Sequence, residues 1–317
     1  MKKTILLFSA LLIFGNLSAQ DKAALVNPII GTNGMGHTFP GACVPFGLVQ
    51  LSPDTDTIPH NVDGKYQPRA YEYCAGYQHK DSSIVGFSHT HFSGTGHSDL
   101  GDILIMPATG ELKLNPGTAT DPDGGYRSRF SHDTEVSRPG YYEVMLADYG
   151  VKAQLTATKR VGVHKYTFPK EAKNQRIILD MIHGIYNYDG KVLWTNIRVE
   201  NDTLVTGYRI TNGWARTNYT YFAMSFSKPI THYGCEEKAK VNYRGGYAKF
   251  NMKENFPDIG GRKIVAYFDF DPKTSDELEV KVALSGVSTE GALKNLRAEA
   301  SGADFDQLAA KASDTWN

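Results

Sequence analysis

The sequence has no excess of either charge, few cysteines, and no long apolar run after its first twenty residues. Lysine plus arginine number 34 and aspartate plus glutamate number 34, so the formal net charge is +0. Because nucleic-acid phosphates are bound by a clustered basic excess, this balance argues against a nucleic-acid partner. A membrane span needs about 20 apolar residues, so we expect no membrane span either.

Only three cysteines occur, Cys43, Cys74 and Cys235. A secreted chain stapled by disulfides usually carries an even and denser set. One disulfide at most can form, which leaves at least one thiol free. We interpret the three mainly as small buried apolar residues.

Aromatic residues and glycine are plentiful: 18 Tyr, 15 Phe and 31 Gly among 317 residues. This mixture favours β-structure with many turns. Apolar residues make up 41% and charged residues 21%, which is typical of a folded globular protein rather than a disordered one. The length allows one large domain or two smaller ones.

The N-terminus has the three parts of a secretory signal peptide. Lys2 and Lys3 are basic, residues 5–14 are apolar, and Leu17-Ser18-Ala19 offers small residues for cleavage. We therefore predict a signal peptide over residues 1–19, cleaved near Ala19, and a secreted or periplasmic protein. A membrane anchor is disfavoured because this apolar run is too short to cross about 30 Å of hydrocarbon.

From Tyr141 onward, apolar and polar residues alternate with the period of two that is typical of half-buried strands. Residues 148–150 suit a hairpin turn between the first two such runs. Turns are also expected at Asn201-Asp202, Asn212-Gly213 and Gly260-Gly261. Further strands are predicted at 161–168, 176–181, 191–200, 203–211, 219–227, 248–253, 263–270 and 278–284. The pattern predicts a mainly β fold, an antiparallel β-sandwich over residues 20–286.

Residues 287–317 have a helical pattern instead. Ser288 can cap a first helix, and a second is expected to begin near Asp304. The second helix has an apolar face formed by Phe305, Leu308, Ala312 and Trp316. The chain stops without a glycine, so we interpret this helix as interrupted; a natural C-terminal helix is the alternative.

Residues 31–47 form a glycine-rich segment whose exposed amides suit a polar ligand. A purely structural loop is the alternative, and no phosphate-loop motif is present. The segment 86–102 is rich in histidine: His89 and His91 would share one face of a strand, and His97 and Asp99 follow. Three readings of this second segment stay open, namely recognition of sugar hydroxyls, a metal site, and a polar cluster that supports the loop. Asp54 is interpreted as a solvated or capping residue.

Several motifs occur in a specific order along the chain. VNPIIGT begins at Val26, HTFPGA at His37 and GFSHTHFSGTG at Gly86. Further matching segments are 44–47, 50–55, 76–77, 99–104, 138–142 and 285–288. Together they resemble the N-terminal domain of glycoside hydrolase family 92, the calcium-dependent α-mannosidases.

The resemblance implies a galactose-mutarotase-like β-sandwich followed by an (α/α)6 barrel. In that family an inverting hydrolysis uses a Glu acid and an Asp base from the barrel, which also supplies most of the coordination of Ca2+. This chain ends near the expected start of the barrel, so it offers no catalytic residue and no Ca2+ is expected for the chain alone. We expect it to be inactive by itself.

The resemblance also implies that loops of this domain line the sugar subsites. The substrate-binding candidates are His37, Thr38, Phe39, Tyr71, Cys74, His89, His91, Ser93, Gly94 and Asp99. Many family members place a Trp where this sequence has Tyr71, which puts the α-1,2 linkage preference in doubt.

Two functional hypotheses follow. The first is the domain that lines the substrate site of a secreted α-mannosidase, with mannose-containing glycans as substrates and the missing barrel as a partner in cis or in trans. The second is a stand-alone carbohydrate-binding or interaction module. A free-standing module should not leave the apolar face of the second helix uncovered, and we expect that face to be open for the barrel.

Overall fold

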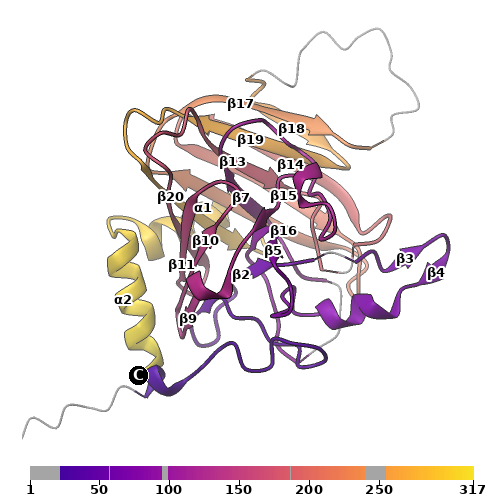
Figure 1. The fold of residues 1–317 in the computed structure, drawn as a ribbon. Helices are drawn as coiled ribbons and strands as arrows, with labels where there is room; N and C mark the ends of the chain where they lie inside the picture. Colours follow the sequence, from indigo (N-terminus) through magenta and orange to yellow (C-terminus); the bar gives the residue numbers. More distant parts are fainter. Residues whose placement is uncertain (1–21, 57, 95–98, 186, 240–254) are drawn as a thin grey trace, which may run out of the picture.

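The structure, a computed structural model, describes residues 22–56, 58–94, 99–185, 187–239 and 255–317. Within these ranges two antiparallel sheets stack into a β-sandwich, and two α-helices pack along one side of it (Figure 1). The predicted fold class is confirmed. The signal peptide and the strand expected at 248–253 lie outside the described residues.

The first sheet has seven strands in the spatial order β1-β2-β6-β7-β13-β19-β17. In that order they are Ala42–Cys43, Gln50–Asp54, Gly86–Ser88, Leu104–Ala108, Gln175–Asp180, Ile264–Phe270 and Ile230–Glu237. Four of these strands come from the part of the chain before residue 110, so this sheet carries the glycine-rich and histidine-rich segments at its β1 side.

The second sheet has nine strands in the order β18-β14-β15-β16-β20-β12-β11-β10-β9. They are Asp258–Gly261, Val192–Asn201, Leu204–Thr211, Asn218–Phe226, Glu277–Ser285, Val161–Thr167, Val151–Ala157, Tyr141–Leu146 and Val136–Arg138. Two further two-stranded sheets are separate from these: the hairpin of Asn61–Val62 (β3) with Lys65–Tyr66 (β4), and the long-range pair of Ser83–Ile84 (β5) with Ser128–Arg129 (β8). Short 3-10 helices are η1 (Ala23–Leu25), η2 (Pro68–Tyr73), η3 (Pro122–Gly124) and η4 (His132–Thr134).

The predicted alternation is visible in β11, where Val151, Ala153 and Leu155 are buried and Lys152 and Gln154 lie between them at the partly exposed positions. The hairpin predicted at 148–150 joins β10 to β11. Strands β17 and β18 were not predicted, because β17 carries charged residues and β18 is only four residues long.

The turn predicted at Gly260-Gly261 is wrong. Both glycines lie in edge strand β18, where they pair with Asn196 and Thr195. A Cβ on Gly260 would lie 3.2 Å from the Trp194 ring, and one on Gly261 would collide with the side chain of Glu237. The glycines therefore permit close approach of neighbouring side chains rather than a reversal of the chain.

Both C-terminal helices form where the sequence places their caps. In α1 (Thr289–Ala300) the Ser288 hydroxyl accepts from Gly291 N at 3.0 Å, and α2 (Phe305–Trp316) begins with a capping box between Asp304 and Gln307.

The expectation of an uncovered apolar face on α2 is wrong. Phe305 and Leu308 are buried against Tyr141, Val161 and Val163 of the nine-stranded sheet. The reason is that β12 alternates: its odd positions face the helices while Gly162, His164 and Tyr166 face the space between the sheets. Figure 1 shows α2 running along the side of the sandwich. The sandwich itself therefore covers the face that we expected a barrel to cover.

The end of α2 is tied to the start of the described chain. Trp316 Nε1 donates to the Cys43 carbonyl at 2.7 Å, and Ala23 N donates to Asn317 Oδ1 at 3.0 Å. None of the three cysteines forms a disulfide; Cys74 and Cys235 are buried as expected, and Cys43 is half-buried. Among the described residues no helix has the length and apolar character needed to cross a membrane.

Candidate functional site

The two segments singled out in the sequence meet at one end of the sandwich. Gly94 N, in the histidine-rich segment, donates to the His37 carbonyl of the glycine-rich segment at 2.8 Å. The rings of Phe39 and His91 lie 5.5 Å apart between centroids. Residues that are more than fifty positions apart in sequence thus form one surface.

His37 is the most unusual residue of this surface. Its φ of 51° is in the left-handed region, which residues other than glycine rarely adopt. Its Nε2 is buried and has no hydrogen-bond partner within the described part of the chain. The ring meets Tyr71 edge to face at 4.9 Å between centroids. A strained backbone with an unsatisfied imidazole nitrogen is a feature that clusters at ligand sites.

Tyr71 and Cys74 come from η2 and the turn that follows it. Cys74 is 1% exposed and its thiol donates to the Tyr71 carbonyl at 2.7 Å, so it fixes the turn. The Tyr71 ring is 38% exposed. Tyr71 can therefore contact a ligand directly, whereas Cys74 supports its position.

Three of the predicted residues line a groove of about 380 Å³. These are Thr38, Phe39 and Ser93, and Trp316 of α2 lines the same groove. The remaining lining residues are Lys22, Ala23, Val26, Pro28, Ile30, Gly41, Cys43, Pro139 and Gly140. Gly94 and Ser93 are exposed beside it.

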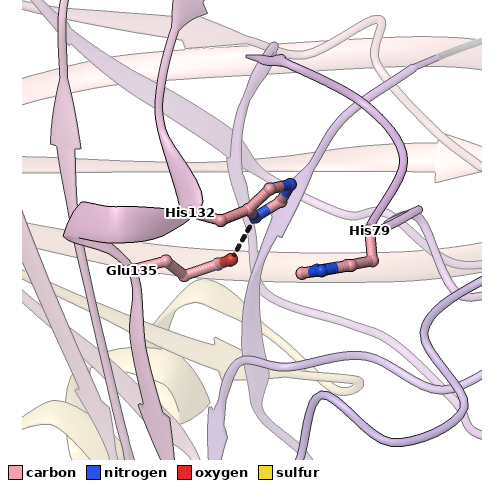
Figure 2. Close-up of side chains that lie close together, drawn as sticks. All are labelled: His79, His132 and Glu135. Atoms are coloured by element: carbon pink, nitrogen blue, oxygen red, sulfur yellow. Dashed lines mark hydrogen bonds and ion pairs between the residues drawn. The ribbon is translucent and has the colours of Figure 1, made fainter.

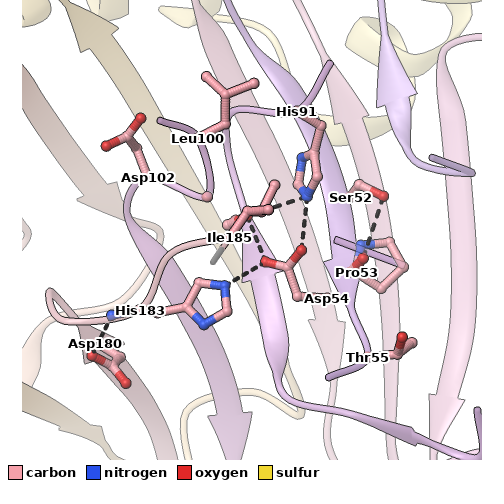
Figure 3. Close-up of polar contacts among 12 residues, drawn as sticks. Ser52, Pro53, Asp54, Thr55, His91, Leu100, Asp102, Asp180, His183 and Ile185 are labelled. Carbon is pink, nitrogen blue, oxygen red and sulfur yellow. Dashed lines mark hydrogen bonds and ion pairs between the residues drawn. The ribbon is translucent and has the colours of Figure 1, made fainter. Parts of the chain in front are cut away.

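His91 is buried beneath this surface and is held by a carboxylate (Figure 3). Its Nδ1 lies 2.8 Å from the Gln50 carbonyl and its Nε2 lies 2.9 Å from Asp54 Oδ1. Both ring nitrogens thus lie at hydrogen-bond distance from oxygen atoms, and these contacts fix the orientation of the ring. His91 therefore positions the loop, with Phe39 between it and the groove.

Asp54 joins His91 to a second histidine, His183, which follows β13 of the same sheet. Its Oδ2 accepts from His183 Nε2 at 2.8 Å and from the Ser88 hydroxyl at 2.6 Å. Burial by itself would raise the pKa of this carboxyl, but the two imidazoles hold that pKa well below its usual value. The interpretation of Asp54 as solvated or capping is wrong, since it is 1% exposed and lies in β2.

A second buried carboxylate fixes the far end of the histidine-rich segment. Asp102 accepts from Arg209 Nε of β15 at 2.6 Å and from the Thr90 hydroxyl at 2.8 Å. Asp99 accepts from the backbone N–H of Trp214 at 3.0 Å, so it holds the β15–β16 loop. The C-terminal end of the segment is thereby anchored to β15 and to the loop that follows it.

His89 does not share a strand face with His91, because β6 ends at Ser88. His89 is fully buried between the sheets, where its Nδ1–H donates to the Ile103 carbonyl at 2.6 Å. Its Nε2 then accepts from His164 Nε2 at 3.0 Å, and His164 Nδ1 accepts from the Tyr166 hydroxyl at 2.8 Å. Burial lowers the pKa of His89 to about 4 and that of His164 well below its usual value, so both rings are neutral. For His89 the geometry matches the reading as a supporting polar cluster.

The metal reading of the histidine-rich segment finds no support in the described residues, since His97 lies outside them. Where the structure describes the chain, one group has metal-ligand spacing, and it is a different one: His79, His132 and Glu135 (Figure 2). Ca2+ takes six to eight oxygen ligands, whereas this group offers two imidazole nitrogens and one carboxylate. It does not fit Ca2+, so we derive no calcium-dependent step from this chain.

The sequence analysis missed Asp54, His183 and this His79 group. Asp54 lies in the segment QLSPD, which has strand-like alternation that its proline obscures. His183 lies 129 positions from Asp54, and His79 comes from a separate segment, so no spacing in the sequence joins these residues to their partners. His132 and Glu135 are three residues apart, and that local spacing is a signal the sequence analysis did not use.

Two stacked antiparallel sheets with a ligand-sized groove define a β-sandwich domain with a candidate ligand site. The chain belongs to glycosyl hydrolase family 92: the family's N-terminal domain profile matches residues 25–285.

Solved structures and a curated protein agree with this assignment. A family GH92 α-mannosidase from Bacteroides thetaiotaomicron, solved in complex with mannoimidazole, shares 40% identity and a TM-score of 0.80 over 93% of this chain and 36% of its own. A family GH92 inverting mannosidase from the same species shares 27% identity and a TM-score of 0.69 over 92% of this chain and 35% of its own. An uncharacterized secreted glycosidase of Arthroderma benhamiae is 25% identical over 93% of this chain and 37% of its own length. The chain thus spans little more than a third of each relative.

Proposed function

We propose that this chain is the N-terminal domain that lines the sugar site of a secreted α-mannosidase, which hydrolyses terminal α-mannosides of glycans with inversion. Its parts would be a signal peptide over 1–19, the sandwich over 20–286, and a helical linker over 287–317. The observation that carries the proposal is the meeting of the two loops at Gly94 and His37, with the unsatisfied Nε2 of His37 beside them. Family membership and the likeness to two mannosidases support the reaction class.

In this proposal one set of residues contacts sugar and a second set holds the first in place. His37 Nε2 would exchange a hydrogen bond with a sugar hydroxyl, Tyr71 and Phe39 would offer ring faces, and Thr38 and Ser93 would offer hydroxyls. Four residues act as positioning residues: Cys74, His89, His91 and Asp99. Gly94 leaves room for the ligand, since no atom of the described residues lies within 4 Å of where its Cβ would stand.

The catalytic acid and base would come from the barrel, in cis or in trans. An inverting pair of carboxyl groups stands about 6.5–9.5 Å apart to admit water. Ca2+ would be held largely by barrel residues, where it would bind sugar hydroxyls. The contribution of this chain is to bind and orient the sugar, which lowers the entropic part of the barrier.

A stand-alone carbohydrate-binding module is the second candidate, and one observation favours it: the apolar face of α2 is covered by the chain's own sandwich. Activity measurements separate the two. We expect the 317-residue chain alone to release no mannose from an aryl α-mannoside with Ca2+ present, and the chain joined to its barrel to release β-mannose, as read by proton NMR at early times.

In the joined protein, His37→Ala should lower kcat/KM about 3- to 10-fold, the equivalent of one hydrogen bond to an uncharged hydroxyl, about 0.5–1.5 kcal/mol. Mannose binding without hydrolysis by the joined protein would favour the binding module. Turnover by the chain alone that survives repurification would overturn the assignment of the acid and base to the barrel.

A further inference from the structure

A cluster of metal-ligand type lies outside the groove, on the turn that holds η4. The ligand atoms of His79, His132 and Glu135 all lie within 4.8 Å of one another, and none of these residues lines the groove. Figure 2 shows the two imidazoles and the carboxylate turned toward one another from two separate segments of the chain. His132 Nδ1 already lies 2.8 Å from Glu135 Oε2.

The Glu135 carboxylate is buried and accepts hydrogen bonds from neighbouring side chains, as metal-ligating carboxylates usually do. Its side chain is only 3% exposed. Tyr77 donates its hydroxyl to both carboxylate oxygens, at 2.9 and 3.0 Å, and Tyr142 donates to Oε1 at 2.6 Å. Such outer hydrogen bonds fix the orientation of a ligand and are typical of metal centres. The carboxylate therefore needs little rearrangement to bind a cation.

His79 supplies the second observation. Its Nδ1 is buried and makes no hydrogen bond within the described part of the chain. The ring of His79 lies 4.0 Å from that of His132, centroid to centroid, and Phe130 meets the His132 ring edge to face at 5.0 Å. A buried imidazole nitrogen without a donor or acceptor has a lone pair that a cation can use.

We propose that His79, His132 and Glu135 bind a divalent transition-metal ion, with Zn2+ as the representative of the class. Two imidazole nitrogens and one carboxylate oxygen suit Zn2+, Co2+ and Ni2+, and do not suit Ca2+ or Mg2+. Three protein ligands leave one coordination position, which water fills from the exposed side of His132, whose side chain is 37% exposed. Ligand atoms in tetrahedral Zn2+ sites stand about 3.3 Å apart, so a small rotation of the His132 ring closes the site.

The bound ion would link the turn that contains η4 to His79, which helps to hold the glycine-rich segment in place. His79 N donates to the Thr32 carbonyl at 2.8 Å, and the neighbouring Gln78 bonds both the N–H and the carbonyl of Gly34. Metal binding therefore braces the loop that ends at His37. This site is distinct from the sugar groove, and the proposal does not depend on the proposed function.

Titration of the 317-residue chain with Zn2+, followed by calorimetry, tests the site. We expect one ion to bind per chain, and His132→Ala to weaken its binding at least 10-fold. His232→Ala is the matched control, because its side chain is 40% exposed and belongs to no such cluster. Unchanged binding by the His132→Ala variant, or no binding by the unmodified chain, overturns the proposal.

Co2+ distinguishes this site from binding at the free thiols. Coordination by two histidines and a carboxylate gives visible d–d absorption without the near-ultraviolet charge-transfer band of a cobalt thiolate. A charge-transfer band that disappears on Cys43→Ser would place the ion elsewhere and overturn the proposal. Glu135→Gln offers a second ligand variant: its amide oxygen can still accept the hydrogen bonds that Tyr77 and Tyr142 donate to Oε1, and circular dichroism checks its fold. A loss of Co2+ absorption in the folded variant supports the site.

Discussion

The nine-stranded sheet and the loop region before Ile103 satisfy their buried polar groups in opposite ways. In β10, β11 and β12 the backbone ladders pair the amides, and apolar side chains fill the space between the sheets. In the loop region, side chains replace the ladder: Thr90 Oγ accepts from the N–H groups of Gly101 and Asp102, and Gln78 pairs with Gly34. The irregular backbone is therefore defined by a few polar residues.

This difference has an energetic consequence. In a sheet, the loss of one side chain leaves the ladder intact, so the cost is that of a cavity. In the loop region the loss of one carboxylate leaves several buried donors without an acceptor, and each carries a desolvation cost. Single substitutions there should have large effects at positions that no apolar pattern marks.

The largest effect is expected from Asp54→Ala. The change leaves His91, His183 and Ser88 without their shared acceptor, and breaking a buried ion pair costs about 3–5 kcal/mol. The free energy of unfolding from urea denaturation measures it. Asp189→Ala is the control, because that side chain is 93% exposed in its ion pair with Lys263 and its loss should leave stability unchanged. Equal stability of the two variants would remove the claimed contrast between the regions.

The second effect is the loss of stability on acidification between pH 6.5 and 4. His89 has a folded pKa lowered to about 4 by burial, whereas an unfolded histidine titrates near its usual value of about 6.5. Below pH 6.5 the unfolded chain therefore binds more protons than the folded one, and the unfolding free energy falls with falling pH. The difference between the folded and the unfolded pKa of His89 corresponds to about 3 kcal/mol of unfolding free energy.

Denaturant midpoints measured across that pH window check the titration. The His89→Gln variant cannot take up a proton at this position, so its unfolding free energy should depend less on pH. Part of the pH dependence should remain, because burial also lowers the pKa of His164. His232→Gln, a partly exposed histidine, should leave the curve as it is. A flat curve for the unmodified chain would show that these two rings are protonated in the fold.

The same contrast explains what the sequence could predict. Alternation in 151–157 and the Ser288 and Asp304 caps depend on near neighbours along the chain, so the strands from Tyr141 and both α-helices follow from local pattern. The resemblance located the loops at His37 and Gly94. Whether β12 covers the apolar face of α2 depends on which face of the strand contacts the helix. Only the three-dimensional structure shows this contact.

The buried polar contacts could not be predicted for a physical reason. Asp54 and His183, or His79 and His132, are joined only by the folded backbone, and histidine looks the same in sequence whether it is neutral between sheets like His89 or paired with a carboxylate like His91. Sequence spacing alone thus grouped His89 with His91, although their partners differ.

A smaller effect on stability, with a large effect on function, is expected from His37→Gly. Glycine adopts a φ of 51° without strain, so the unfolding free energy should change by less than about 1 kcal/mol. In the protein that includes the barrel, kcat/KM should fall because the imidazole is lost. Asp63→Gly is a matched control, since Asp63 has the same φ of 51° in the exposed β3–β4 turn. A drop in kcat/KM for both variants would show that backbone freedom, not the imidazole, is responsible.

The smallest effect is expected where the helical part meets the loop region. Trp316→Phe keeps an aromatic ring at a position that is 39% exposed but removes the hydrogen bond from Nε1 to the Cys43 carbonyl. One such bond contributes about 0.5–1.5 kcal/mol, and partial exposure places the loss at the lower end of that range. Hydrogen exchange should therefore accelerate in the last turn of α2 while the amides of β11 keep their protection. Trp194→Phe, at 40% exposure on β14, serves as the comparison and should leave exchange in α2 unchanged. If hydrogen exchange in β11 accelerates together with that in α2, the helix and the sheet unfold as one unit. The loop region, rather than the sheet, then limits the stability of both.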